Sequence, residues 1–152
     1  MNNKWLFLLL FILIPFGCHE PEEIIEVQTQ IDAFLIDINP QLYQATTKMM
    51  AELTLVDQKI QKLYDLKDRF PNQRDMVNKA LKQWQGLRKN LDSTLRHIRH
   101  KAERAYVAYE LDEIQGKKKF SVVAQELLKE ANTVLANAET TKSLIEEELY
   151  GQ

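Results

Sequence analysis

Three side chains in the middle of the sequence have the types and the spacing of a metal site. His97, His100 and Glu103 follow one another at intervals of three, so they share part of one face if this segment is helical. Imidazole and carboxylate are suitable ligands for divalent metals. The neighbouring side chains are mostly basic, however, and repel a cation. We therefore predict a solvated or charge-paired face here, with no bound metal and no other cofactor.

The same stretch holds the densest group of basic residues in the chain. A cluster of this kind can bind an anion, such as a lipid headgroup, a glycan or an acidic protein surface. The alternative is that these bases pair with acids of neighbouring helices, for example Glu126 and Glu130. The candidate anion-binding residues are Arg96, Arg99, His100, Lys101 and Arg104.

Catalytic patterns are missing from the sequence. It contains no Gly-x-Ser-x-Gly motif, no glycine-rich phosphate-binding loop and no Cys-x-x-Cys-His motif. The adjacent carboxylates Glu146, Glu147 and Glu148 have no visible pocket around them. Tyr106 and Tyr109 could line a ligand groove, but aromatic residues at helical spacing usually belong to a core. We therefore predict that the protein is not an enzyme.

The first seventeen residues have the pattern of an export signal. Lys4 precedes an apolar run from Trp5 to Phe16, and Gly17 precedes Cys18, the only cysteine of the chain. A transmembrane helix needs roughly 20 apolar residues, and this run is shorter. A basic start, a short apolar centre and a small residue before the cut are typical of a cleavable secretory signal.

Gly17-Cys18 resembles the lipobox of bacterial lipoproteins, whose cysteine is acylated and becomes the first residue of the mature chain. The resemblance covers only residues 1–18, and it is imperfect. Pro15 stands where an aliphatic residue is usual, and Phe16 where a small residue is usual. It implies that Cys18 is the lipid attachment site and that several fatty chains anchor the protein stably to a membrane. An ordinary signal peptide or an uncleaved anchor is the alternative.

The resemblance also implies a location. In Gram-negative lipoproteins an aspartate after the cysteine favours the inner membrane, and this chain has His19 there. We therefore expect an outer-membrane protein that faces the periplasm. If Cys18 carries lipid, no thiol remains for a disulfide, a thiolate metal site or a nucleophile.

Apolar residues recur at steps of three and four in three stretches, 24–70, 77–109 and 120–149. This spacing predicts three long helices, each with a continuous apolar seam. Pro40 falls inside the first stretch, where it either kinks the helix or, with an asparagine before it, opens a new one. We expect a kink or brief break with the same face buried, and a complete break would give four helices.

Proline and glycine mark the predicted boundaries. Pro71 ends the first helix, and Asn72 can cap the second. Gly116, followed by three lysines, predicts a left-handed C-cap of the second helix, and Ser121 can cap the third. Gly86 lies inside the second helix, where glycine costs about 1 kcal/mol relative to alanine. We expect a close helix crossing or a bulky neighbour at Gly86.

The charge of the chain is unevenly distributed. Residues 20–72 carry ten acids and five bases, residues 73–119 six acids and twelve bases, and residues 120–152 six acids and two bases. Opposite charges beside an apolar seam set the choice and orientation of partner helices. We therefore predict that the middle helix lies between the other two and pairs with both. An anionic partner of the basic middle segment is the alternative.

These observations predict an all-α protein, an elongated, antiparallel, coiled-coil-like three-helix bundle. Its parts are a signal peptide at 1–17, a tether at 18–23 and the bundle at 24–150. The membrane anchor and the missing catalytic patterns favour a role in protein–protein contact, as an accessory or assembly factor of a cell-envelope machine such as a secretion system or pilus. An anion-binding lipoprotein and an exclusion or immunity lipoprotein are the alternatives, and no nucleic-acid partner is expected.

Overall fold

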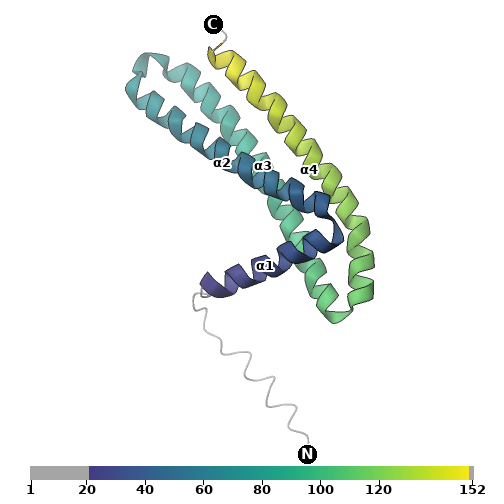
Figure 1. Ribbon diagram of the computed structural model, residues 1–152. Coiled ribbons are helices and arrows are strands. Elements are labelled where there is room, and N and C mark those ends of the chain that lie inside the picture. Colours follow the sequence, from purple (N-terminus) through teal and green to yellow (C-terminus); the bar gives the residue numbers. More distant parts are fainter. Residues whose placement is uncertain (1–20, 151–152) are drawn as a thin grey trace, which may run out of the picture. The chain divides into compact units, whose positions relative to one another are not determined.

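The computed structural model describes the backbone of residues 21–150 and the side chains of residues 28–112 and 114–149. This part of the chain is all-α, as predicted, and no strand occurs in it. The predicted signal peptide and Cys18 lie outside the described residues. The elements are α1 (Pro21–Ile38), α2 (Pro40–Arg69), the short 3-10 helix η2 (Pro71–Gln73), α3 (Arg74–Leu111) and α4 (Glu113–Tyr150) (Figure 1).

The described chain has four α-helices rather than three, because the first predicted helix is interrupted at Asn39, directly before Pro40. This residue has an extended backbone, with φ −154° and ψ 87°. Its side-chain oxygen accepts a hydrogen bond of 3.0 Å from the backbone nitrogen of Leu42, which makes Asn39 the N-cap of α2. Pro40 occupies the first helical position, where no backbone donor is needed. The described chain therefore has four α-helices.

The connection between α2 and α3 lies where proline predicts it, but its capping differs. Phe70 ends α2, and its backbone nitrogen donates to the Leu66 carbonyl at 2.9 Å. Asn72 lies inside η2 and caps nothing; α3 follows Gln73, whose side chain makes no capping hydrogen bond. The predicted cap at Asn72 was wrong because a 3-10 turn continues the chain directly into α3.

The connection between α3 and α4 is a single residue, Asp112, rather than a glycine cap at Gly116. Asp112 is extended, and its side chain accepts a hydrogen bond of 3.1 Å from the backbone nitrogen of Gln115. It therefore caps α4 and takes the role predicted for Ser121. Ser121 instead lies within α4, where its hydroxyl donates to the Lys118 carbonyl at 2.9 Å.

Gly116 is required by a close approach of two helices. A Cβ atom at Gly116 would lie 2.6 Å from the Cα atom and 2.8 Å from the backbone nitrogen of Tyr109. Gly116 has an ordinary negative φ, so its role is to leave room rather than to allow a left-handed turn. The absence of a side chain at Gly116 lets α4 turn back tightly against α3.

The three helices α2, α3 and α4 pack together with their predicted seams inside. Figure 1 shows α3 antiparallel to both α2 and α4. Leu66 and Phe70, at the end of α2, are exceptions and remain exposed. The largest side chains that are almost fully buried are Trp84, Leu35, Leu42, Met49, Leu91, Ile98, Ile145 and Val56.

Aromatic side chains hold the last turns of α1 against the α3–α4 hairpin. Phe34 stacks on Phe120 at 5.4 Å between ring centroids, and it lies 5.7 Å from Tyr106 and 5.4 Å from Tyr109. The Lys117 ammonium lies 5.4 Å from the Tyr109 ring and 2.9 Å from an Asp37 carboxylate oxygen. Tyr106 and Tyr109 therefore pack into this cluster, consistent with the core role preferred from sequence.

Gly86 does not lie at a close crossing, so that prediction was wrong. A Cβ atom built there meets no heavy atom within 4 Å. Gly86 lines a shallow groove between α3 and α4, and the neighbouring Trp84 points into the core instead.

We expect Gly86→Ala to stabilise the protein by about 1 kcal/mol, because alanine lowers the conformational entropy of the unfolded chain and here meets no neighbour. Urea denaturation followed by far-UV circular dichroism measures this change. A loss of stability would mean that Gly86 is needed for a contact.

Candidate functional site

The three candidate metal ligands of the sequence, His97, His100 and Glu103, do not converge. His97 faces α4, with its Nε2 atom 3.9 Å from a Glu130 carboxylate oxygen. The Nδ1 atom of His100 lies 3.9 Å from a carboxylate oxygen of Glu103 on the same helix. The side chains of His100 and Glu103 are both largely exposed. Among the described residues, no three His, Cys, Asp or Glu side chains are grouped so that they could hold a metal ion.

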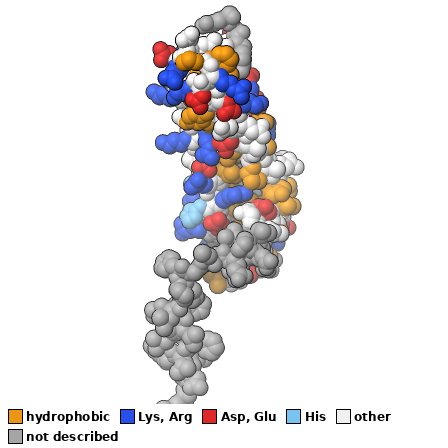
Figure 2. Space-filling model, turned by 90° about the vertical axis from the view of Figure 1, so that its left-hand side faces the viewer, with side chains coloured by type: hydrophobic (Ala, Val, Ile, Leu, Met, Phe, Trp, Pro, Cys, Tyr) orange, Lys and Arg blue, Asp and Glu red, His pale blue; other side chains and the backbone are white. Residues whose placement is uncertain are grey.

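The basic cluster of α3 is divided between different faces of the helix. Arg96 pairs with Asp92, one turn earlier, at 3.0 Å. Arg99 turns toward α2, where its guanidinium lies 3.0 Å from the Met50 sulfur. Figure 2 shows basic side chains spread along one face of the molecule and interleaved with acidic ones. The remaining candidate anion-binding residues, His100, Lys101 and Arg104, are exposed to solvent.

Bases of α3 form ion pairs with both neighbouring helices, as the charge distribution predicts. The Arg88 guanidinium donates to Asp57 of α2 at 2.6 Å, and Lys79 lies 3.2 Å from Glu148 of α4. The hydrogen bond to Asp57 raises the pKa of Arg88 above its ordinary value. In these pairs, bases of the positively charged α3 therefore neutralise acids of the negatively charged helices beside it.

One ion pair between α2 and α4 is shielded from solvent. The Lys142 ammonium lies 2.7 Å from a Glu52 carboxylate oxygen, and the two side chains are only 20% and 11% exposed. Lys142 also donates to Glu139 at 3.2 Å. Burial acts to lower the pKa of Lys142, but the hydrogen bonds to Glu52 and Glu139 outweigh it and raise that pKa.

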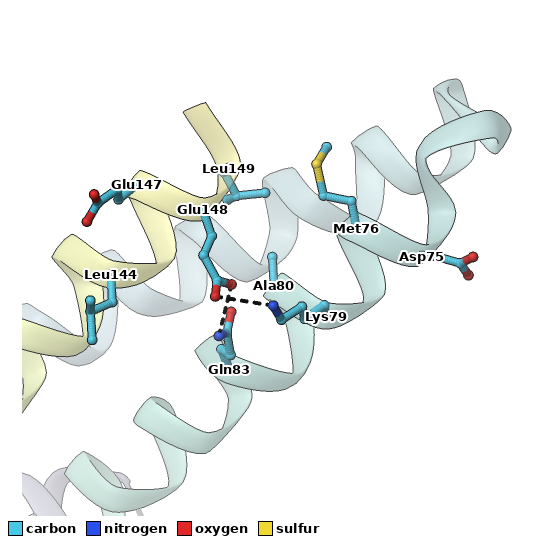
Figure 3. Close-up of a pocket in the computed structure, with 9 residues that line it drawn as sticks. All are labelled: Asp75, Met76, Lys79, Ala80, Gln83, Leu144, Glu147, Glu148 and Leu149. Atoms are coloured by element: carbon cyan, nitrogen blue, oxygen red, sulfur yellow. Dashed lines mark hydrogen bonds and ion pairs between the residues drawn. The ribbon is translucent and has the colours of Figure 1, made fainter. Parts of the chain in front are cut away.

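A cleft of about 800 Å³ lies between the first turns of α3 and the last turns of α4. Figure 3 shows the side chains that line it, from α3 on one side and α4 on the other. Its apolar lining includes Met76, Ala80, Leu144 and Leu149. Met76 and Leu144 are 38% and 57% exposed, so these apolar side chains remain accessible to a partner.

Polar side chains cross the cleft at one point. Glu148 accepts hydrogen bonds from Lys79 at 3.2 Å and from Gln83 at 3.3 Å, and these bonds lower the pKa of Glu148 (Figure 3). The Gln83 Oε1 atom is buried and has no hydrogen-bond partner in the described part of the chain. Asp75 and Glu147 also line the cleft, and neither forms an ion pair within residues 28–112 and 114–149.

Sequence reasoning did not find this cleft. In the sequence, Glu147 and Glu148 are only adjacent carboxylates with no pocket in evidence. Met76 and Leu144 each precede a buried seam residue by one position, so they lie beside the seam rather than on it. Apolar residues beside a seam are the feature of the sequence that could have indicated the cleft. Only the packing of α3 against α4, however, brings Met76 and Leu144 to the same cleft.

Comparison of the chain with protein-family models, with curated proteins and with solved structures found no match. No helix among residues 21–150 combines the length and the apolar character that a membrane crossing requires.

Proposed function

We propose that this protein is a lipid-anchored helical protein of the bacterial cell envelope that acts by protein–protein contact. In this proposal it is an accessory or assembly factor of an envelope machine, such as a secretion system or pilus, and not an enzyme. Acylated Cys18 holds it at the outer membrane, where it faces the periplasm.

The observation that carries this proposal is the α3–α4 cleft. Exposed Met76 of α3 and Leu144 of α4 both line it, on either side of the hydrogen bonds from Lys79 and Gln83 to Glu148 (Figure 3). Apolar side chains that share a groove are typical of protein interaction sites. The anion-binding alternative has less support, because Arg96 and Arg99 make contacts within the bundle.

We expect Cys18→Ala to release the protein from membranes, because the acyl chains would be its only stable attachment. Membrane fractionation of cells that express the wild type and the variant measures this change. Cys18→Ser serves as a second variant of similar size. Retention of both variants in the membrane fraction would contradict the lipoprotein assignment.

The contact role is tested by site-specific photo-crosslinking in living cells, with a photoreactive residue placed at several exposed positions of the bundle. We expect a discrete crosslinked product with one envelope protein, and a defect in the corresponding envelope machine when the gene is deleted. If no exposed position crosslinks and deletion causes no envelope defect, the contact role is wrong.

A further inference from the structure

We propose that the cleft between the first turns of α3 and the last turns of α4 binds a cationic amphipathic helix of a partner protein. The partner helix places its apolar face on Met76 and Leu144 and its lysine or arginine side chains beside Asp75 and Glu147. This inference rests on the proposed function, for which it names the contact surface and the chemistry of the partner.

The apolar part of the cleft suits a helix. Met76 is 38% exposed and lies on α3, while Leu144 is 57% exposed and lies on α4, so the two sides of the cleft each contribute an accessible apolar side chain. The small side chain of Ala80 lies between them on the α3 wall, next to the hydrogen bonds that Glu148 accepts from Lys79 and Gln83 (Figure 3). An amphipathic helix binds a groove of this kind with side chains spaced three and four apart.

The negative charge of the cleft lining favours a positively charged partner. Lys79 is already neutralised by Glu148 at 3.2 Å. Asp75 and Glu147 form no ion pair in the described part of the chain. Asp75 lies in the first turn of α3, where the helix dipole stabilises an acid, whereas Glu147 lies near the C-terminal end of α4, where the dipole disfavours one. A cationic helix supplies the missing partners, whereas an anionic ligand is repelled.

The end of α4 adds to this preference. Glu146, Glu147 and Glu148 lie near the C-terminal end of the helix, and its last turn holds no basic residue. The negative end of the helix dipole disfavours acids and favours cations. Glu146 is compensated by Lys59 and Glu148 by Lys79, but Glu147 is not. A cation from a partner would neutralise Glu147 and interact favourably with the negative end of the helix dipole.

Two other occupants fit less well. A second copy of this chain exposes Leu111 and Ile114 at the turn from α3 to α4, but the acids Glu110 and Asp112 adjoin Leu111 and suit a negatively charged cleft less well than bases would. An anionic membrane surface is repelled by Asp75 and Glu147. A separate cationic helix meets neither obstacle.

A synthetic peptide of about 18 residues, or five helical turns, tests the inference. It has leucine and alanine on one face, lysine on the flanking positions and a fluorescent label. We expect saturable binding to the purified protein, measured by fluorescence anisotropy and weakened by added salt. A peptide of the same composition in scrambled order, and one with glutamate in place of lysine, should each bind at least about tenfold more weakly.

Protein variants locate the binding site. The double variant Met76→Ser/Leu144→Ser and the charge reversal Glu147→Lys should each weaken peptide binding about tenfold or more. Leu55→Ser, at an apolar residue of α2 that is 50% exposed, and Glu126→Lys, at an exposed acid of α4, should leave binding unchanged. Far-UV circular dichroism confirms that all four variants fold.

Equal binding by the cleft variants and the control variants would overturn the inference, and so would equal binding of the three peptides or no binding at all. Concentration-dependent dimerisation that the cleft variants abolish would assign the cleft to a second copy instead. The proposed function fails separately: it is wrong if no surface position crosslinks in cells, and it survives if crosslinks form only at positions outside the cleft.

Discussion

Gly116→Ala lowers the free energy of unfolding by about 2 kcal/mol. The new methyl group would lie 2.6 Å from the Tyr109 Cα atom, which belongs to the backbone and cannot move aside as a flexible side chain can. Overpacking of this kind typically costs 1–3 kcal/mol. It exceeds the gain of about 1 kcal/mol that alanine brings within a helix. Urea denaturation monitored at 222 nm, a wavelength that reports helix content, measures the change.

Gly86→Ala is the matched control, because it is the same substitution in the adjacent helix, at a position with open space. The two variants should therefore change stability in opposite directions. The near-UV circular dichroism of Gly116→Ala should also change, since Tyr109 packs against Phe34 in the aromatic cluster. A Gly116→Ala variant as stable as Gly86→Ala would contradict the close approach of α4 to α3.

Lys142→Ala should destabilise the protein by about 3 kcal/mol. The substitution leaves the Glu52 carboxylate buried between α2 and α4 without its partner at 2.7 Å. Removing one partner of a buried ion pair costs more than the pair itself contributes, because the remaining charge stays shielded from water. Thermal and urea denaturation at neutral pH measure the loss.

Lys59→Ala provides the control for this substitution. Lys59 and Glu146 also join α2 to α4, at 2.9 Å, but their side chains are 43% and 47% exposed. An exposed pair contributes about 0–1 kcal/mol, so this variant should remain close to the wild type. The double variant Glu52→Leu/Lys142→Met removes both charges and should recover most of the stability. Equal effects of Lys142→Ala and Lys59→Ala would show that the Glu52 pair is not effectively buried.

The pH dependence of the Lys142 effect follows from its raised pKa. A group whose folded-state pKa lies above its unfolded value stabilises the protein fully below the unfolded pKa, which for lysine is about 10.4. This contribution is lost as the pH rises through the higher folded-state pKa. The stability difference between wild type and Lys142→Ala should therefore persist from pH 7 to about pH 10 and shrink above it.

Much of the bundle interior could be predicted from the sequence. The spacing of apolar residues identified the buried faces of α2, α3 and α4, including Trp84, Leu91 and Ile145. This succeeded because a helix repeats every 3.6 residues, so a regular apolar pattern has only one way to be buried. The charge distribution predicts that bases of the middle helix pair with acids of both neighbours, since opposite charges beside a seam attract. The structure identifies Arg88 with Asp57 and Lys79 with Glu148 as two such pairs.

The helix boundaries were less predictable because several residues at each connection are able to cap a helix. Asn39 caps α2 as its position before proline suggests, but Asp112 rather than Ser121 caps α4. The two glycines show the same limitation. The sequence predicts a close neighbour at Gly86 and a left-handed cap at Gly116, yet Gly86 meets open space and Gly116, with a negative φ, faces the Tyr109 backbone.

The sequence by itself determined the helical class, the buried seams and the matching of charges between helices, because these depend on periodicity and composition along one chain. It also carries the whole case for the lipid anchor at Cys18. Only the tertiary structure decided that Gly116 lies against Tyr109, that Glu52 and Lys142 meet in a shielded pair, and that Met76 and Leu144 share a cleft. Each of these depends on how the axes of two helices approach, a distance that no local pattern encodes.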